Sequence, residues 1–347
     1  MDAKRSSIPA RLLDWYDAHR RDLPWRAKPG EAVEPYRVWL SEVMLQQTTV
    51  AAVRPRFATW VARWPTFAAL AAADDADVMA AWAGLGYYAR ARNLVAAAKT
   101  VVADHDGAFP RTEAALRKLP GFGAYTAAAV AAIAFGERAV VVDANVERVV
   151  ARLFAISVPL PGARPAIRAA ADSITPDARA GDFAQGMMDL GSGVCTPRAP
   201  KCLLCPLRAQ CAGFATGAPE AFPVKAARKA KPQRYGTIFW LEQDGAVLLV
   251  RRPPEGLLGG MRALPTGAWS DAPPGLEGAP APADWRLLDV CVRHGFTHFD
   301  LDLALAVAHT QGHQPADASE WWPVESLASA GLPTVFAKAA ETMERLR

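Results

Sequence analysis

The stretch Leu119-Pro-Gly-Phe-Gly-Ala-Tyr-Thr-Ala-Ala128 decides the fold of the N-terminal part of the chain. Helical patterns flank it over residues 112–119 and 125–135, so it forms a hairpin between two helices. Gly121 and Gly123 let the backbone turn tightly and expose amide groups, and Gly123 leads directly into a helix N-terminus. Such amides and the helix dipole bind phosphate without sequence preference. A glycine turn between helices is also a common structural feature. The hairpin alone therefore fits a phosphate-binding site and a purely structural turn equally well.

Outward from this hairpin, residues 8–212 carry apolar side chains at intervals of three and four, which predicts helices throughout. Pro35 is expected to start a helix that runs to about Thr48, and Asp143 to start another. Residues 213–234 are different, because basic side chains occur there among alanines and prolines. This composition predicts a solvated linker that can also touch phosphate groups. Its basic residues are Lys225, Arg228, Lys229, Lys231 and Arg234.

After Tyr235 the pattern changes to the alternation that is typical of strands. Residues 235–242, 246–251 and 301–308 are expected strands. The prolines and glycines of residues 268–284 predict an exposed loop. The expected fold is therefore multidomain: an all-α domain (1–212), a basic linker (213–234) and a smaller α+β domain (235–347). One face of the last strand should carry Leu301, Leu303, Leu305 and Val307.

The composition is that of an ordinary soluble globular protein, with 347 residues, 51% hydrophobic and 21% charged. The net charge of +4 permits a polyanionic partner without requiring one. Residues 1–22 are charged throughout and lack the apolar core of a secretory signal. The longest apolar stretch, residues 127–135, is far shorter than the roughly 20 residues of a membrane span. We expect a cytoplasmic, monomeric protein that does not contact membranes.

Four of the five cysteines lie in residues 195–211, separated by six, two and five residues. Disulfides are unusual in the cytoplasm, so this spacing indicates metal binding. A structural zinc site suits four thiolates, but zinc ribbons usually present two Cys-x-x-Cys pairs, and only one is present. The single compact loop favours a [4Fe–4S] cluster. The expected ligands are Cys195, Cys202, Cys205 and Cys211.

The cysteine loop also contains two basic residues, and one further cysteine lies outside it. Arg198 and Lys201 lie between the first two expected ligands, where a rigid loop could present them to phosphate groups. Plain solvent exposure explains both equally well. Cys291, the remaining cysteine, is expected to be buried and structural.

Several of these features resemble the endonuclease III superfamily, whose members share the helix-hairpin-helix motif. The hairpin, the segment Val140-Val-Val-Asp-Ala-Asn-Val146 and the cysteine loop match in content and order. Leu23-Pro-Trp-Arg26, Ser41-Glu-Val-Met-Leu-Gln-Gln-Thr48 and Gly84-Leu-Gly-Tyr-Tyr-Ala-Arg90 resemble the MutY adenine glycosylase branch. The resemblance runs from about Leu12 to the end of the chain and is densest in the first domain. It implies base excision repair of adenine paired with 8-oxoguanine or guanine in double-stranded DNA.

Tyr125 separates two branches of this superfamily. Members that cleave the strand as well as the base carry a nucleophilic lysine just after the hairpin, where this chain has Tyr125. Without that amine no Schiff base can form with the sugar. The sequence therefore predicts a monofunctional glycosylase.

Two carboxylates are candidates for cutting the bond between adenine and deoxyribose. Such cleavage needs a proton delivered to the base and stabilisation of an oxocarbenium-like sugar, and two carboxylates in different environments can share this work. Glu42 is the candidate acid, because an apolar helix face around it would favour the protonated form. The alternative is a structural glutamate that faces solvent or is hydrogen-bonded. Asp143 is the candidate for charge stabilisation, although aspartate is also a favoured helix N-cap. The resemblance assigns catalytic roles to both and supporting roles to Tyr125 and Asn145.

The base must leave the duplex before it is cut, which costs a few kcal/mol. The resemblance assigns Tyr87 to the wedge beside the lesion and Gln47 to the position that reaches into the base stack. Two adjacent aromatic residues are usually part of a core, so we expect Tyr88 to serve packing only.

The second domain resembles Nudix domains in Leu248-Leu-Val-Arg-Arg252 and Gly256-Leu-Leu-Gly-Gly-Met261. Nudix hydrolases need a glutamate cluster for metal, and only scattered acids follow Gly267, so a binding role is expected. In MutY proteins a loop matching Phe296-Thr-His298 recognises 8-oxoguanine, with Thr297 here in place of the usual serine. A strand-edge Thr and His satisfied locally is the structural alternative. Related proteins commonly carry a Trp-Glu-Phe-Pro type of segment where this chain has Arg262-Ala-Leu-Pro265. The packing around this segment is therefore not predicted by the resemblance.

Other functions stay open at this point. An endonuclease III-like lyase would act on damaged pyrimidines and be trapped by borohydride. A non-catalytic iron–sulfur DNA-binding protein would need neither Glu42 nor Asp143. A Nudix hydrolase would consume free nucleoside triphosphates.

Overall fold

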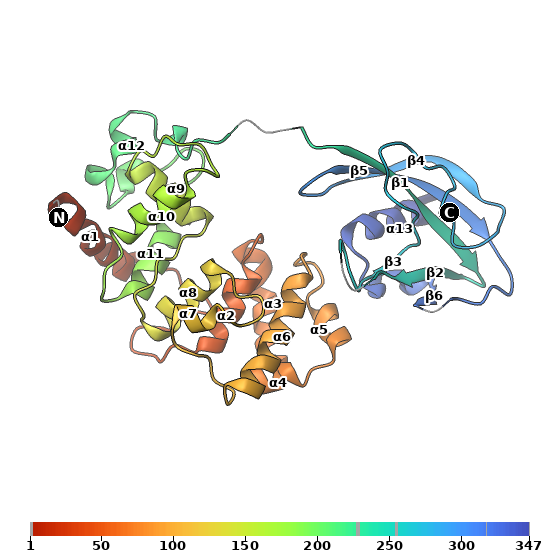
Figure 1. Cartoon of the computed structure of the whole chain (residues 1–347), viewed down its shortest axis with the longest axis horizontal. Coiled ribbons are helices and arrows are strands. Elements are labelled where there is room, and N and C mark those ends of the chain that lie inside the picture. The colour runs from red at the N-terminus through yellow and green to blue at the C-terminus, as the bar shows by residue number, and fades with distance from the viewer. Residues whose placement is uncertain (1–2, 227–229, 254–255, 317, 347) are drawn as a thin grey trace. The chain divides into compact units, whose positions relative to one another are not determined.

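The computed structural model describes residues 3–226, 230–253, 256–316 and 318–346. The chain divides into two compact units, residues 1–227 and 228–347 (Figure 1). The first unit is helical. Its helices are α1 (Ala3–His19), α2 (Pro35–Met44), α3 (Val50–Arg63), α4 (Phe67–Ala71), α5 (Asp75–Ala81), α6 (Ala89–Asp104), α7 (Glu113–Leu116), α8 (Ala124–Phe135), α9 (Ala144–Leu153), α10 (Arg164–Asp172), α11 (Ala180–Gly193) and α12 (Ala212–Ala215), with short 3₁₀ turns at Cys202–Leu204, Arg208–Gln210 and Pro219–Ala221.

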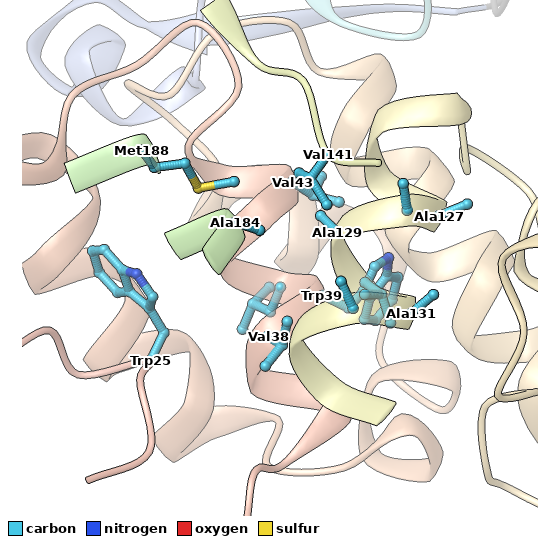
Figure 2. Close-up of a cluster of buried hydrophobic side chains, with 14 of the residues drawn as sticks. Trp25, Val38, Trp39, Val43, Ala127, Ala129, Ala131, Val141, Ala184 and Met188 are labelled. Carbon is cyan, nitrogen blue, oxygen red and sulfur yellow. The ribbon is translucent and has the colours of Figure 1, made fainter. Parts of the chain in front are cut away.

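The alanine-rich helix α8 lies in the core of this unit, where it packs against both α2 and α11. Small side chains allow the close approach. At Gly181 of α11, any Cβ would collide with the carbonyl oxygen of Ala132 in α8. The core therefore places α2, α8 and α11 side by side. Figure 2 shows this packing with Ala127, Ala129 and Ala131 of α8, Val38, Trp39 and Val43 of α2, and Ala184 and Met188 of α11.

The helix that begins at Pro35 ends at Met44, and the expectation that it would continue to about Thr48 is wrong. Residues 45–48 form turns, and Gln47 has a φ of +55°, which a right-handed helix cannot contain. The side chain of Thr49 then caps α3 by accepting a hydrogen bond from the amide of Ala52. The chain thus leaves the right-handed helical conformation within three residues of the end of α2.

The hairpin joins α7 to α8 as expected, although α7 is shorter than the predicted helix. Gly121 has a φ of +73°, and a Cβ there would lie 2.6 Å from the Cβ of Asn93 on α6. Gly123 is the N-cap of α8, and the space beside it is open. Backbone geometry therefore explains Gly121 but does not require glycine at Gly123, whose extended backbone suits any residue and whose open side leaves room for a ligand.

Part of the expected linker belongs to the helical unit. Gly213 packs directly on the backbone of Arg152, and the amide of Leu160 donates to the carbonyl of Val224 at 2.9 Å. Residues 213–226 therefore fold back on the helices through backbone contacts that composition does not predict. Arg228 and Lys229 lie outside the described residues.

The second unit is built on a six-stranded sheet with the order β3-β2-β1-β5-β4, and β6 pairs with β2. β1 and β5 are parallel, with Trp240 opposite Val307, and the other pairs are antiparallel. The three expected strands are confirmed as β1, β2 and β5, and residues 268–284 form an irregular loop as expected. The elements are β1 (Gln233–Gln243), β2 (Ala246–Arg251), β3 (Arg262–Ala263), β4 (Arg286–Gly295), β5 (Asp300–His309), β6 (Ser319–Pro323), a 3₁₀ segment (Val324–Ala330) and α13 (Thr334–Leu346).

One face of this sheet carries the core of the second unit. Leu301, Leu303 and Leu305 are fully buried there with α13, whereas Val307 is half-buried. The expectation that Cys291 is buried is wrong, because it lies exposed on the edge strand β4.

Two basic residues of the expected linker also lie in the second unit. Lys231 pairs with Asp300 at 3.7 Å, and Arg234 pairs with Asp271 at 2.5 Å. Both cations are therefore engaged within their own unit. No helix in the described part of the chain is long and apolar enough to cross a membrane.

Candidate active site

Glu42 lies in the buried part of α2 and is 7% exposed. It lines a narrow cavity of about 40 Å³. The wall of the cavity is largely apolar, with Ile133 of α8 as one member. Trp25, Val38 and Met188, all labelled in Figure 2, are others. The apolar surroundings expected for Glu42 are thus assembled from segments far apart in the sequence.

This environment changes the protonation of Glu42. Burial raises the pKa of its carboxyl group from 4.5 to about 7, and the charge of Asp143 acts in the same direction. Hydrogen bonding from Tyr125 and the charge of Arg26 lower the pKa in part. The hydroxyl of Tyr125 donates to Oε2 of Glu42 at 2.5 Å. Glu42 can therefore carry a proton near neutral pH, as a general acid must.

Asp143 is the N-cap of α9, which confirms its expected position at a helix start. Its Oδ1 accepts a hydrogen bond from the amide of Val146 at 2.7 Å, and its Oδ2 accepts from Nδ2 of Asn145 at 2.9 Å. The charge of Asp143 also acts on both Glu42 and Tyr125. Asp143 can therefore cap α9 and also lie close to Glu42. The fold brings the four candidate catalytic residues together, namely Glu42, Tyr125, Asp143 and Asn145.

The four clustered cysteines line one cavity, which also includes Arg152 and Phe214. Arg152 is 2% exposed, and its guanidinium donates to Sγ of Cys195 at 3.4 Å and to the carbonyl of Thr196 at 2.7 Å. Within the described residues, no three His, Cys, Asp or Glu side chains are placed to hold one metal ion. The thiols thus surround a common space without converging on a single point.

Arg148 connects this cysteine loop to Asp143. Its Nε donates to the carbonyl of Cys195 at 2.7 Å, and its Nη2 donates to Oδ1 of Asn145 at 3.0 Å. Since Asn145 in turn donates to Asp143, hydrogen bonds run without a break from the loop to the candidate carboxylate. The loop therefore helps to fix the position of Asp143.

Two candidate DNA-contacting residues have unusual backbone conformations. Gln47 and Tyr87 have φ values of +55° and +49°, and both side chains are exposed, that of Tyr87 to 52%. Left-handed conformations are uncommon for residues other than glycine and cluster at functional sites. Tyr88, by contrast, packs against the core, as expected.

Arg90 holds the segments of Gln47 and Tyr87 near each other. Its guanidinium donates to the carbonyl of Val43 at the end of α2, at 2.7 Å, and to the carbonyl of Leu85 at 2.8 Å. The two exposed side chains therefore stand on segments that Arg90 ties together. Arg198 and Lys201 are exposed on the cysteine loop, and no ion pair involves either of them in the described part of the chain.

In the second unit, the turn between β4 and β5 presents the candidate recognition residues. The amide of Phe296 donates to the carbonyl of Phe299 at 2.9 Å, and the ring of Phe296 stacks on Trp269 at 5.6 Å. Thr297 and His298 are exposed at the tip of this turn. The aromatic contact anchors the turn while its polar side chains face outward.

The packing around Arg262 is also defined. Its Nε donates to Oε1 of Glu320 at 2.7 Å, and its guanidinium lies 4.6 Å from the ring centroid of Trp322. The departure from the family pattern at this segment is thus accommodated by an ion pair and a cation–π contact.

Comparison with known proteins identifies both units. A family model described as HhH-GPD superfamily base excision DNA repair protein matches residues 40–168, and a NUDIX domain model matches residues 237–342. The adenine DNA glycosylase of Rattus norvegicus is 34% identical over an alignment of 407 positions, gaps included, that covers 97% of this chain and 78% of the rat protein. The chain belongs to the adenine DNA glycosylase family. The expected family and the two-part fold, helical and Nudix-like, are confirmed.

Other adenine DNA glycosylases match over different extents. The protein of Mycolicibacterium smegmatis is 44% identical and covers 61% of this chain, which spans 72% of that protein. The human enzyme is 38% identical and covers 77% of this chain, which spans 58% of the human protein.

Solved structures support the helical fold. A thermostable thymine-DNA glycosylase superposes with a TM-score of 0.55 at 30% identity, covering 61% of this chain and 97% of that one. Endonuclease III in a non-covalent complex with DNA superposes with a TM-score of 0.51 at 23% identity, covering 62% of this chain and 99% of that one. The second likeness concerns the fold alone.

Several residues of the site were not found from the sequence. Arg21 and Arg26 line the Glu42 cavity, and both bind the buried carboxylate of Asp189 on α11. Arg26 stands in a stretch typical of the adenine DNA glycosylase family, but nothing local indicates its partner, which lies 163 residues away. Arg90 likewise ends a quoted motif, and only the structure shows which carbonyl groups it binds.

Proposed function

We propose that the chain is a monofunctional DNA glycosylase that releases adenine paired with 8-oxoguanine or guanine in double-stranded DNA. The observation that carries this proposal is a buried Glu42, with a pKa of about 7, held beside Asp143. A carboxylic acid kept protonated near neutral pH suits proton delivery to a leaving base. The names of the relatives support adenine as that base.

The reaction follows from these positions. The extruded adenine is brought beside Glu42, and the bond between C1′ and N9 breaks with its electron pair moving to the base. Glu42 supplies the proton that the departing purine needs. The negative charge of Asp143 stabilises the oxocarbenium-like sugar until water adds to C1′ and loses a proton. Tyr125 holds the carboxyl group of Glu42 in place through its hydroxyl, and Asn145 does the same for Asp143.

Tyr125 also accounts for the absence of strand cleavage in this proposal, because a phenol cannot form a Schiff base. The test is to incubate duplexes containing 8-oxoguanine opposite adenine, and separately oxidised thymine, with and without borohydride. Efficient adenine release with little trapped protein–DNA adduct is expected. Selective release of oxidised thymine, or abundant trapped adduct, would favour a lyase instead.

The rate of base release should depend on pH in a defined direction. Glu42 acts while protonated, so the single-turnover rate should fall as pH rises through about 7. Replacing Tyr125 by Phe removes a hydrogen bond that favours the ionised carboxylate, so the falling limb should move to higher pH even though the rate is lower. A wild-type rate that stays constant from pH 6 to about 9 would contradict this assignment.

We further propose that the loop of residues 195–211 holds a [4Fe–4S] cluster. Four thiols around one cavity fit this group, in which each thiolate binds its own iron, better than they fit a single zinc ion. When bound, the cluster would cross-link the loop and thereby fix the exposed Arg198 and Lys201. The ligands would be Cys195, Cys202, Cys205 and Cys211.

The purified protein should therefore contain about four iron atoms and acid-labile sulfide. Replacing Cys202 by Ser should lower both contents, whereas replacing the exposed Cys291 by Ser should leave both unchanged. One equivalent of zinc without sulfide would support the structural zinc site instead.

The DNA contacts complete the proposal. The backbone amides of Gly121 and Gly123, together with Arg198 and Lys201, would bind phosphate groups. Tyr87 would wedge beside the vacated position and Gln47 would reach into the base stack. The exposed tip of the turn at Phe296, Thr297 and His298 would recognise 8-oxoguanine, with a hydroxyl and an imidazole as hydrogen-bonding groups.

A further inference from the structure

Asp189 on α11 is a buried carboxylate, and both of its oxygens accept hydrogen bonds from two arginines. Its side chain is 2% exposed. Its Oδ1 accepts hydrogen bonds from Nε of Arg21 at 2.6 Å and from Nη2 of Arg26 at 2.8 Å. Its Oδ2 accepts from Nη1 of Arg26 at 2.6 Å and from the backbone amide of Arg21 at 3.2 Å. Arg26 and Asp189 thus form a bidentate pair, which fixes the plane of the guanidinium.

Both arginines line the cavity of Glu42, but Asp189 does not. The side chain of Arg26 is 7% exposed, so water screens its charge poorly. That charge favours the ionised form of Glu42 and thus opposes the protonated form. Without a counter-ion, Arg26 would work against the proton donor that shares its cavity.

Asp189 supplies this counter-ion. Burial alone would raise the pKa of Asp189, but the hydrogen bonds from Arg26 and the charges of Arg26 and Arg21 hold it below its usual value. Asp189 is therefore ionised wherever the enzyme is folded and near neutral pH. Its negative charge is paired with the two arginines, and Arg26 is the member of this cluster whose charge acts on Glu42.

We propose that Asp189 is a positioning residue for base excision, which holds Arg21 and Arg26 in the cavity wall and offsets their charge, so that Glu42 keeps its proton at neutral pH. This inference rests on the proposed function, in which Glu42 is the acid. The other titratable groups that act on Glu42 are Tyr125 of α8 and Asp143 at the start of α9. Neither of them is bound to Asp189, so their effect on the protonation of Glu42 should be the same in the wild type and in a variant of Asp189.

A purely structural role for Asp189 predicts a different result. If Asp189 only supported the packing of α11, its loss would lower the excision rate by the same factor at every pH. Loss of a counter-ion would instead shift the pH at which the rate falls. The pH profile therefore separates the two roles.

The experiment measures single-turnover adenine release across the pH range of about 5 to 9 for Asp189→Asn and wild type. In Asp189→Asn the midpoint of the falling limb should move about one pH unit lower, because the charge of Arg26 then acts on Glu42 without compensation. The matched control is Asp182→Asn, on the same helix, since Asp182 pairs with Arg179 and does not line the Glu42 cavity. Its profile should superimpose on that of the wild type.

A double variant, Arg26→Met with Asp189→Asn, tests the charge argument and guards against misfolding. Removing both members of a buried ion pair is tolerated better than removing one. The midpoint of the double variant should return toward the wild-type pH whatever its maximal rate. A uniform loss of rate in Asp189→Asn, or a double variant that keeps the shifted midpoint, would overturn the proposal. A wild-type profile without any falling limb would instead disprove the acid role of Glu42.

Discussion

Replacing Glu42 by Gln is expected to lower the single-turnover rate of adenine release by roughly a hundred- to ten-thousandfold at neutral pH, the usual contribution of a general acid. Glutamine has nearly the same shape but carries no proton that it can transfer. The purine would then have to leave as an anion. The measurement is release of adenine from an 8-oxoguanine:adenine duplex with enzyme in excess. Affinity for the same duplex should change little, because Glu42 is not one of the proposed phosphate contacts.

The stability of this variant provides its control. Burial raises the pKa of Glu42 from 4.5 to about 7 in the folded state, so burial favours the neutral form. The stability that the neutral group contributes is fully present below the unfolded pKa of 4.5, and it is lost as pH rises from there through the folded pKa of about 7. Glutamine cannot ionise, so the variant should become more stable than the wild type above pH 7, by up to roughly 3 kcal/mol.

Urea unfolding at a pH below 4.5 and at a pH above the folded pKa of about 7 measures this difference. Gain of stability at high pH together with loss of catalysis would show a folded protein that lacks its acid. Full adenine release by the variant would remove Glu42 from the mechanism.

The features of the chain that could be predicted are those with local signals. The hairpin and the cysteine loop each lie within about twenty residues, so their turn residues and spacing indicate their structure directly. The burial of Glu42 followed from apolar neighbours on the same helix. Strands β1, β2 and β5 were predicted because alternation is visible within one segment.

The features that escaped prediction depend on contacts between distant segments. Asp189 and Arg26 are separated by 163 residues, and each alone is an ordinary charged residue. The expected burial of Cys291 followed the average behaviour of cysteine, but β4 is an edge strand that leaves this side chain in solvent. Residues 213–226 attach through backbone groups, such as the carbonyl of Phe222 that accepts from Arg152, and composition carries no trace of such bonds.

The helix beginning at Pro35 shows another reason why a sequence-based prediction can fail. Its apolar pattern continues through Leu45, so periodicity extends the helix too far. The chain instead turns, and Gln47 adopts a left-handed conformation at the position where contact with DNA is proposed. Local preference fails where a strained backbone presents a side chain, which is common at functional sites.

Asp143 allows its two roles to be separated by two substitutions. Asp143→Asn should lower the rate of adenine release by roughly a hundred- to a thousandfold, since the fixed negative charge beside the sugar is lost. Asparagine is nearly as good an N-cap as aspartate, so the hydrogen bond from the amide of Val146 can remain and the stability should change little. Asp143→Ala should lose a similar factor in rate and, in addition, about 1 kcal/mol of stability.

Single-turnover rates and urea unfolding of both variants therefore distinguish the catalytic role of the negative charge of Asp143 from its structural role as the N-cap of α9. If the carboxylate served only as a cap of α9, Asp143→Asn would retain nearly the wild-type rate and only Asp143→Ala would be impaired. A comparable loss of rate in both variants, with a loss of stability confined to the alanine variant, assigns the catalytic effect to the negative charge. The cap then has its own function, because it orients the carboxylate whose Oδ2 remains bound to Asn145 and, through Arg148, to the cysteine loop.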